Sequence, residues 1–198
     1  MTQSRHVPRW PAAGERFTLF GEVVMVGLLV TIAALPVVTA LPALAAGCTH
    51  LRGHLRAERV SAAGFARTLR TALPGSWGIT VTALASAVVL GFNLLIADAG
   101  LPGAPVVAAT ALALLAAGPV VLIRAAAAWR PGSAWPVLVG QAARATGADV
   151  RGSALLLGAW LLVGVVTWQL PPLVLPAAGS LVLAAIAIDA HAHRGPHQ

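Results

Sequence analysis

The chain has 198 residues, of which 58% are hydrophobic and only 10% are charged. A soluble domain carries about 25% charged residues, so this composition excludes an ordinary water-exposed surface. It predicts a single membrane domain over residues 1–198, with the lipid bilayer as its surroundings. The formal net charge of +7 comes from thirteen basic residues, all arginine, that lie between apolar runs. That distribution follows the positive-inside rule and argues against nucleic acid as a partner.

Apolar runs recur along the chain, and a helix needs about 20 such residues to cross a bilayer. Four runs meet this length: residues 17–35, 75–97, 105–123 and 152–168. A fifth, residues 173–188, is slightly short but wholly apolar. Residues 37–51 form a shorter run, and the positions of the arginines decide how it is interpreted.

The arginines lie in both terminal segments and in two loops, 52–70 and 124–151. The remaining connections contain no basic residue; they are residues 36–42, 98–104 and 169–172. If residues 37–51 cross the membrane, every arginine lies on one side, whereas otherwise the two loops lie on opposite sides.

The positive-inside rule therefore favours six crossings. We expect an all-α polytopic membrane bundle of about six transmembrane helices, the first two forming a tight hairpin. Both termini are expected to be cytoplasmic, with tails at residues 1–16 and 190–198.

The two arginine-rich loops also predict amphipathic helices in the interface plane. Ser61 can cap a helix that runs to Leu73, with Arg67 and Arg70 on its polar face and expected to face lipid headgroups. Its apolar residues follow helical spacing: Ala62, Phe65, Ala66, Leu69 and Leu73. Residues 134–146 repeat the pattern with Trp135, Leu138 and Ala142.

Two further patterns concern the membrane itself. Tryptophan prefers the membrane boundary, and the chain places Trp10, Trp77, Trp129 and Trp135 near the predicted inner boundary and Trp168 near the outer one. Small residues recur every four positions in the third predicted span and predict a helix contact; they are Ala83, Ala87 and Gly91.

Two polar residues lie inside predicted membrane helices. An ionisable side chain at such a depth is costly and faces the bundle or a water-filled cavity. Glu22 is therefore a candidate for a polar pocket or an ion contact, or else for a pair with Arg16 or an arginine of the next loop. Asn93 is a candidate for the same pocket, or for a hydrogen bond to a neighbouring helix.

Histidines occur at two places near the predicted inner face. His50 and His54 are one helical turn apart, but a metal site needs a third ligand and no carboxylate has an obvious spacing, so no metal or cofactor is predicted. Asp189 belongs to a polar tail that we expect to be mobile, together with His191, His193 and His197.

The first hairpin carries the most specific motif. Gly21-Glu22 lies near the start of the first apolar run, and residues 36–42 read Pro-Val-Val-Thr-Ala-Leu-Pro. Residues 65–70 then place an aromatic amphipathic segment in a basic loop. These features, over roughly residues 15–80, resemble the YesL family of bacterial membrane proteins, although Leu73-Pro74-Gly75 departs from the family pattern.

The resemblance implies the cytoplasmic membrane of a bacterium and no established activity or catalytic residues. Members of the family often lie beside carbohydrate-uptake transporter components, which implies an accessory role with permease subunits as partners. Pro36, Thr39 and Pro42 match the family motif and are candidates for a structural or pocket-forming turn.

Three functions remain open from the sequence. An accessory membrane protein without enzymatic activity is the first. A small independent transporter or channel, with Glu22 and Asn93 along a polar path, is the second. The third is an intramembrane enzyme acting on a lipid-linked substrate, with Arg67 and Arg70 holding the headgroup; it ranks last because the sequence shows no catalytic motif.

Overall fold

The fold is all-helical over the residues that the computed structural model describes, which are 13–56, 58, 60–99, 103–170 and 173–192. These ranges contain eight α-helices and one short 3₁₀ helix, and no strand. In chain order they are α1 (Ala13–Ala34), η1 (Val37–Thr39), α2 (Ala40–Leu55), α3 (Ala62–Ala72), α4 (Ser76–Ala97), α5 (Ala104–Ala128), α6 (Trp135–Ala148), α7 (Val150–Gln169) and α8 (Val174–Ala192).

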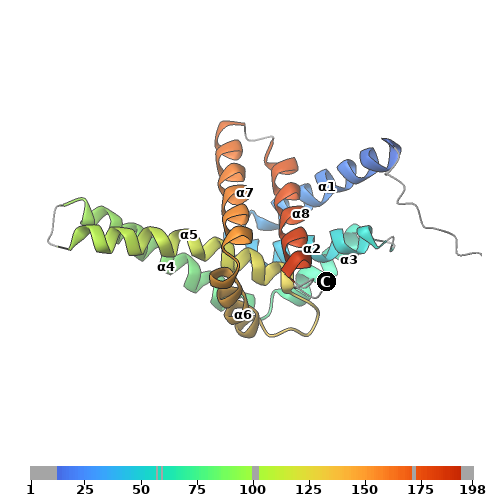
Figure 1. Cartoon of the computed structure of the whole chain (residues 1–198). Coiled ribbons are helices and arrows are strands. Elements are labelled where there is room, and N and C mark those ends of the chain that lie inside the picture. Colours follow the sequence, from blue (N-terminus) through green and yellow to red (C-terminus); the bar gives the residue numbers. More distant parts are fainter. Residues whose placement is uncertain (1–12, 57, 59, 100–102, 171–172, 193–198) are drawn as a thin grey trace, which may run out of the picture.

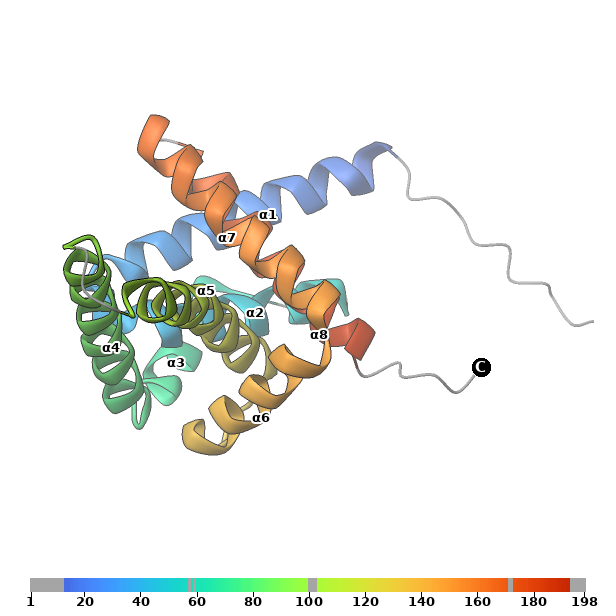
Figure 2. The same cartoon turned by 60° about the vertical axis from the view of Figure 1, so that its left-hand side comes forward.

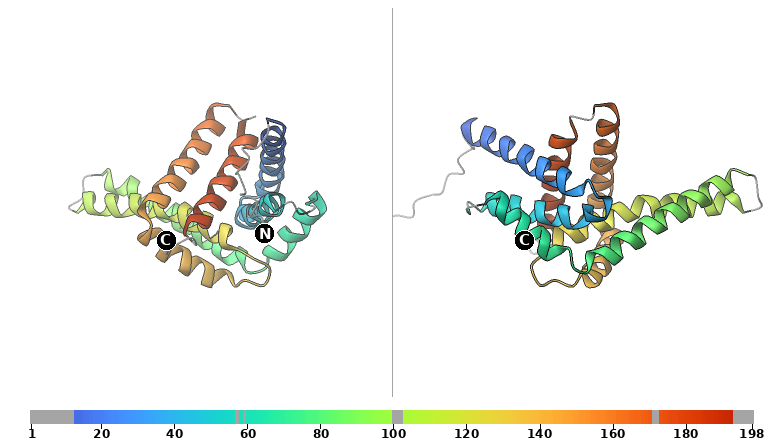
Figure 3. Two further views of the ribbon diagram at one scale, coloured as in Figure 1. Left: turned by 45° about the vertical axis from the view of Figure 1, so that its right-hand side comes forward. Right: turned by 180° about the vertical axis from the view of Figure 1, so that it is seen from behind.

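The long helices form three pairs of sequence neighbours that pack against each other: α1 with α2, α4 with α5, and α7 with α8. The short helices α3 and α6 connect one pair to the next (Figure 1). The pairs point in different directions. Figure 1 shows α7 and α8 upright, α1 rising to the right, and the α4–α5 hairpin projecting to the left. Figure 3 shows the same separation of the α4–α5 hairpin from other sides, and in Figure 2 the hairpin points toward the viewer.

Three helices are long and apolar enough to cross a membrane, namely α4, α5 and α7. Shorter apolar stretches occur in α1 (Phe20–Ala34) and in α8 (Val174–Ala190). The predicted all-α class is confirmed over the described residues, and the three candidate spans support a membrane protein. The number of six crossings stays a prediction.

Helix α2 occupies the centre of the molecule. It contacts α1, α3, α5 and α8, and ten of its 16 residues are buried. Alanine and glycine make this possible, because Ala43, Ala46 and Gly47 let neighbouring helices approach closely. At 1.5 Å per residue α2 is about 24 Å long, which is shorter than the hydrocarbon core of a bilayer. A short apolar run of this kind is typical of a buried core helix.

Helices α1 and α8 cross with their backbones in contact. A Cβ atom added to Gly27 would lie 1.8 Å from the carbonyl oxygen of Leu175, and one added to Gly179 would lie 2.0 Å from that of Val23. No side chain fits at either position without moving a helix. This crossing joins the first helix of the chain to the last.

Both amphipathic helices form as predicted, and helix extends into the predicted tails at both ends. The Ser61 hydroxyl accepts a hydrogen bond from the backbone N–H of Gly64 at 3.1 Å and caps α3. In α6 the buried residues are Trp135, Leu138 and Ala142, which matches the predicted face. Helix α1 already begins at Ala13 and α8 continues to Ala192, so residues 13–16 and 190–192 are helical. The rest of both tails lies outside the described residues.

The glycine crossing can be tested with Gly27→Ala and Gly179→Ala. Each should destabilise the protein by about 1–3 kcal/mol, the usual cost of forcing extra atoms into a packed contact. Gly91→Ala is the matched control, because a Cβ there meets nothing within 4 Å and alanine is the better helix former. Unfolding in detergent, followed by circular dichroism, measures the difference. Equal effects at positions 27, 179 and 91 would contradict the crossing.

Candidate functional site

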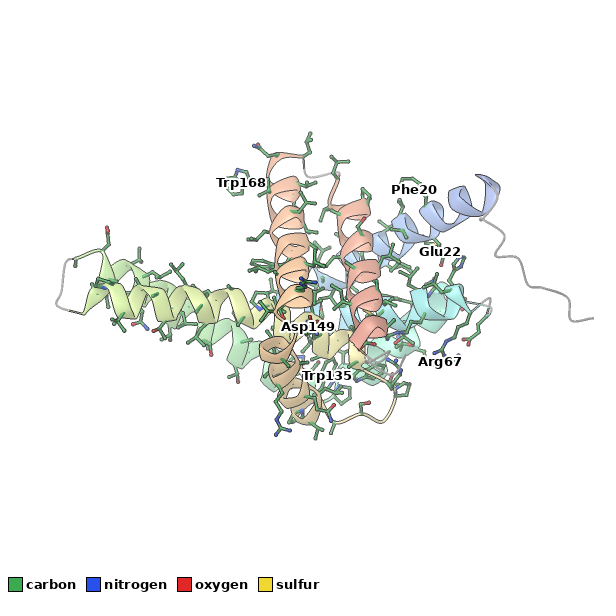
Figure 4. All side chains as sticks on the ribbon, in the orientation of Figure 1. Phe20, Glu22, Arg67, Trp135, Asp149 and Trp168 are labelled. Carbon is green, nitrogen blue, oxygen red and sulfur yellow. The ribbon has the colours of Figure 1, made fainter. Side chains whose placement is uncertain are left out.

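The ion pairs of the described residues gather at one end of the long helices. They join the first half of α1 to the end of α2, the end of α2 to the end of α8, and the end of α5 to the start of α7. These are the ends that the arginine distribution predicts to be cytoplasmic. Figure 4 shows Glu22 and Arg67 on one side of this region and Asp149 at the foot of α7.

Glu22 of α1 lies between two histidines of α2. Its Oε1 is 2.9 Å from Nε2 of His50, and its Oε2 is 3.7 Å from Nδ1 of His54. The i, i+4 spacing places both imidazoles on one side of α2. Glu22 thus faces the neighbouring helix, as expected for a carboxylate at this depth, but its observed partners are histidines rather than an arginine. The side chain of Arg16 lies outside those described.

The three side chains differ in their access to the surroundings. The side chain of His50 is only 3% exposed, whereas that of His54 is 26% exposed. The imidazole of His50 also meets the ring of Phe65 from α3 edge-on, with 6.3 Å between the ring centroids. The Glu22 carboxylate therefore lies between a partly exposed imidazole, that of His54, and a buried imidazole, that of His50, and it is hydrogen-bonded to the buried one.

His50 and His54 carry imidazoles, side chains of the type that bind metal ions. Within the described part of the chain, no group of three His, Cys, Asp or Glu side chains is placed to hold a metal ion. Each imidazole is turned toward its own oxygen of Glu22. In the described geometry His50 is hydrogen-bonded to Glu22, and His54 lies within ion-pair distance of the same carboxylate.

Arg52 links α2 to two other helices. Its Nη2 lies 2.7 Å from Oδ2 of Asp189 in α8 and also donates to the carbonyl oxygen of Ala127 in α5. The prediction that Asp189 belongs to a mobile tail is therefore wrong. Asp189 lies within α8. Because α8 packs against α2, the carboxylate of Asp189 reaches Arg52.

A buried arginine, Arg124, joins α5 to α7. Nη2 of Arg124 lies 2.8 Å from Oδ2 of Asp149 and 3.2 Å from Oγ of Ser153. The other oxygen of Asp149 accepts a hydrogen bond from the backbone N–H of Gly152 at 2.9 Å and so caps α7. These two hydrogen bonds, first that from Arg124 and then that from Gly152, hold the pKa of Asp149 below its usual value.

The Arg124–Asp149 pair was not predicted. An aspartate directly before an apolar run is a recognised N-cap signal, and Asp149 precedes Val150 in this way. Gly152 is needed for the pair, because a Cβ there would lie 2.0 Å from Oδ2 of Asp149.

The predicted turn forms a closed local structure. Pro36 precedes η1, and Pro42 is buried in the first turn of α2. The hydroxyl of Thr39 donates to the carbonyl oxygens of Pro36, at 2.7 Å, and Ala33. Thr39 therefore caps the end of α1, which supports the structural role of the motif.

The candidate pocket residues do not come together in one place. Glu22 and Thr39 lie toward opposite ends of the first hairpin, and Asn93 lies on α4. Asn93 is half-buried, and no hydrogen bond joins its side chain to another described residue. Arg67 and Arg70 are exposed on α3, so their predicted role in facing headgroups stays a prediction.

An open groove runs along the α4–α5 hairpin. It is lined by Val81, Thr82, Ala85, Ser86, Val89, Leu90 and Leu114. Thr82 and Ser86 are exposed there, and their hydroxyls make no hydrogen bond to another described residue. The groove therefore combines an apolar lining with two available hydroxyl groups.

Comparisons with protein-family models, with curated proteins and with solved structures find no match to this chain. The resemblance of residues 15–80 to the YesL family thus stays a prediction.

The Arg124–Asp149 pair predicts a pH-dependent stability. Asp149→Asn keeps an N-cap acceptor but removes the charge facing the buried guanidinium, so its melting temperature at pH 7 should fall by a few degrees. Because the folded-state pKa of Asp149 is lowered, the stabilisation is present above the unfolded pKa of about 4 and is lost as the pH falls through the folded pKa.

Thermal unfolding in detergent between pH 7 and pH 3 measures this difference, which should narrow below pH 4. Asp98→Asn is the control, because Asp98 is exposed at the end of α4 and no ion pair joins it to a described residue. If the melting temperature of Asp149→Asn stays below that of the wild type by a constant amount down to pH 3, the charge of Asp149 is not the cause of the difference.

Proposed function

We propose that this chain is a six-span protein of the bacterial cytoplasmic membrane, with both termini cytoplasmic. In this proposal it has no catalytic activity and serves as an accessory subunit of a carbohydrate-uptake transporter. The arginine distribution and the gathering of ion pairs at one set of helix ends support the topology.

The α4–α5 hairpin is the observation on which the accessory role rests. Both helices have the length and composition of membrane spans, yet most of their surface is exposed, and the hairpin points away from the other two (Figure 1). Membrane helices associate through close packing and interhelical hydrogen bonds. The apolar lining of the groove allows close packing, and the hydroxyls of Thr82 and Ser86 allow interhelical hydrogen bonds. Acyl chains offer no hydrogen-bond partner. A helix of another membrane protein therefore suits this groove better than lipid alone.

The link to carbohydrate uptake rests on the resemblance to the YesL family. Pro36, Thr39 and Pro42 match its motif, and family members often lie beside carbohydrate-uptake transporter components. The partner expected at the groove is accordingly a permease subunit.

Site-specific photo-crosslinking in native membranes tests the accessory role. A benzophenone side chain at position 86, in the groove, should crosslink a permease subunit that mass spectrometry identifies. The same group at position 88 is the control, since Val88 is exposed on α4 but does not line the groove. Deleting the gene should also lower sugar uptake. No permease crosslink at position 86 together with unchanged uptake would exclude the accessory role.

A second candidate function is an independent solute transporter, which the position of the Glu22 carboxylate between the imidazoles of His54 and His50 favours. Groups of this kind can relay protons in membrane proteins. In liposomes, the wild-type protein should then carry a solute or ion, and Glu22→Gln should lower that flux about tenfold or more. Glu58→Gln, at an exposed carboxylate after α2, should leave it unchanged. Absence of wild-type flux for every sugar and ion tested would count against this function.

A further inference from the structure

Two arginines from separate elements meet at the end of α2. Arg52, in the last turn of α2, and Arg130, directly after α5, both donate to the carbonyl oxygen of Ala127. Arg130 also donates to the carbonyl oxygen of Trp129 at 2.9 Å. One oxygen atom thus holds two guanidinium groups close together.

Positive charge exceeds negative charge at this place. Asp189 pairs with Arg52 at 2.7 Å, and Arg56 adds a third guanidinium at the exposed end of α2. Burial, followed by the charges of Arg52 and Arg56, lowers the pKa of Arg130, while Asp189 acts in the opposite sense. Backbone carbonyls accept hydrogen bonds here, but they do not neutralise the excess charge.

One donor in this cluster lacks an acceptor. Nη1 of Arg52 is buried and has no hydrogen-bond partner among the described residues. A buried donor that stays unpaired is costly, and such a group is often explained by a bound water or ion. The adjacent Arg130 and Arg56 are exposed, so the cluster has an open side.

We propose that Arg52, Arg130 and Arg56 bind a phosphate group at this end of the molecule. Phosphate suits the cluster because its several oxygens accept bidentate hydrogen bonds from more than one guanidinium, and its charge balances the excess. The group can belong to an anionic phospholipid, since basic pockets between membrane helices bind such headgroups on the cytoplasmic side, or to free phosphate. The site is distinct from Arg67 and Arg70 on α3 and does not depend on the accessory role.

The test uses the full chain purified in a neutral detergent. Short-chain phosphatidylglycerol, short-chain phosphatidylcholine and inorganic phosphate are added separately, and the melting temperature is measured. Phosphatidylglycerol should raise it more than phosphatidylcholine does, and native mass spectrometry should show retained phosphatidylglycerol. Arg130→Gln should weaken this binding about tenfold, the effect of losing a charge-assisted hydrogen bond. Arg56→Gln should weaken it in the same direction.

Arg144→Gln is the matched control, because it removes the same charge from an exposed position of α6. Stabilisation by inorganic phosphate that equals that by phosphatidylglycerol, and is lost in Arg130→Gln, would identify free phosphate as the ligand and support the site. Two results would overturn the proposal. One is that neither phosphatidylglycerol nor inorganic phosphate stabilises the wild type, and the other is an equal loss of binding in Arg130→Gln and Arg144→Gln. The melting transition of ligand-free Arg130→Gln confirms that the variant is folded.

Discussion

The backbones of α1 and α8 touch at Gly27 and Gly179, and the rest of the molecule is arranged around that contact. Helix α2 packs against both of these helices. Gly47 of α2 faces the same region, where a Cβ would lie 2.5 Å from a methyl group of Val30 and 3.4 Å from one of Val182. Close packing of small residues is what association requires where lipid offers no hydrophobic driving force. The same contact sets the position of α8, and thereby delivers Asp189 to Arg52.

Polar contacts join the helices at one end of the molecule, in addition to the close packing of small residues along their lengths. Arg52 ties α2 to α5 and α8, and Arg124 ties α5 to α7. A stacked pair, Trp129 and Trp135, then fixes α6 against the end of α5, and the indole N–H of Trp135 donates to the carbonyl oxygen of Ala72 in α3. In surroundings of low dielectric constant such pairs are strong, and breaking one leaves a costly orphan. The three helix pairs thus extend in different directions from the polar contacts at this end, and the α4–α5 hairpin points away from the other two pairs.

Local sequence patterns predicted local structure, but they did not predict contacts between residues far apart in the chain. The Ser61 cap and the buried face of α6 follow from neighbouring residues, and α4, α5 and α7 follow from continuous apolar runs, so the sequence predicted all of these. The Arg52–Asp189 and Arg124–Asp149 pairs join residues 137 and 25 positions apart, which no local pattern specifies.

The spacing of Ala83, Ala87 and Gly91 predicted a contact, but a Cβ at Gly91 meets nothing within 4 Å. In a chain so rich in alanine, spacing alone does not identify the glycines that touch. Trp129 and Trp135 were expected at the membrane boundary, but they are buried because each finds a partner inside the protein.

The central position of α2 bears on how so short a helix can belong to the proposed six-span topology. A spanning helix surrounded by lipid must reach polar surroundings with its own length, because every exposed backbone group needs a partner. Helix α2 is surrounded by other helices instead, and non-helical backbone at membrane depth is tolerated where protein covers it. In the turn before it, the hydroxyl of Thr39 donates to the carbonyl oxygens of Pro36 and Ala33 and closes the end of α1. At its end, Arg52 finds Asp189 and the backbone of α5. Its length of about 24 Å, at 1.5 Å per residue, is compatible with the proposed crossing because neighbouring helices cover its sides.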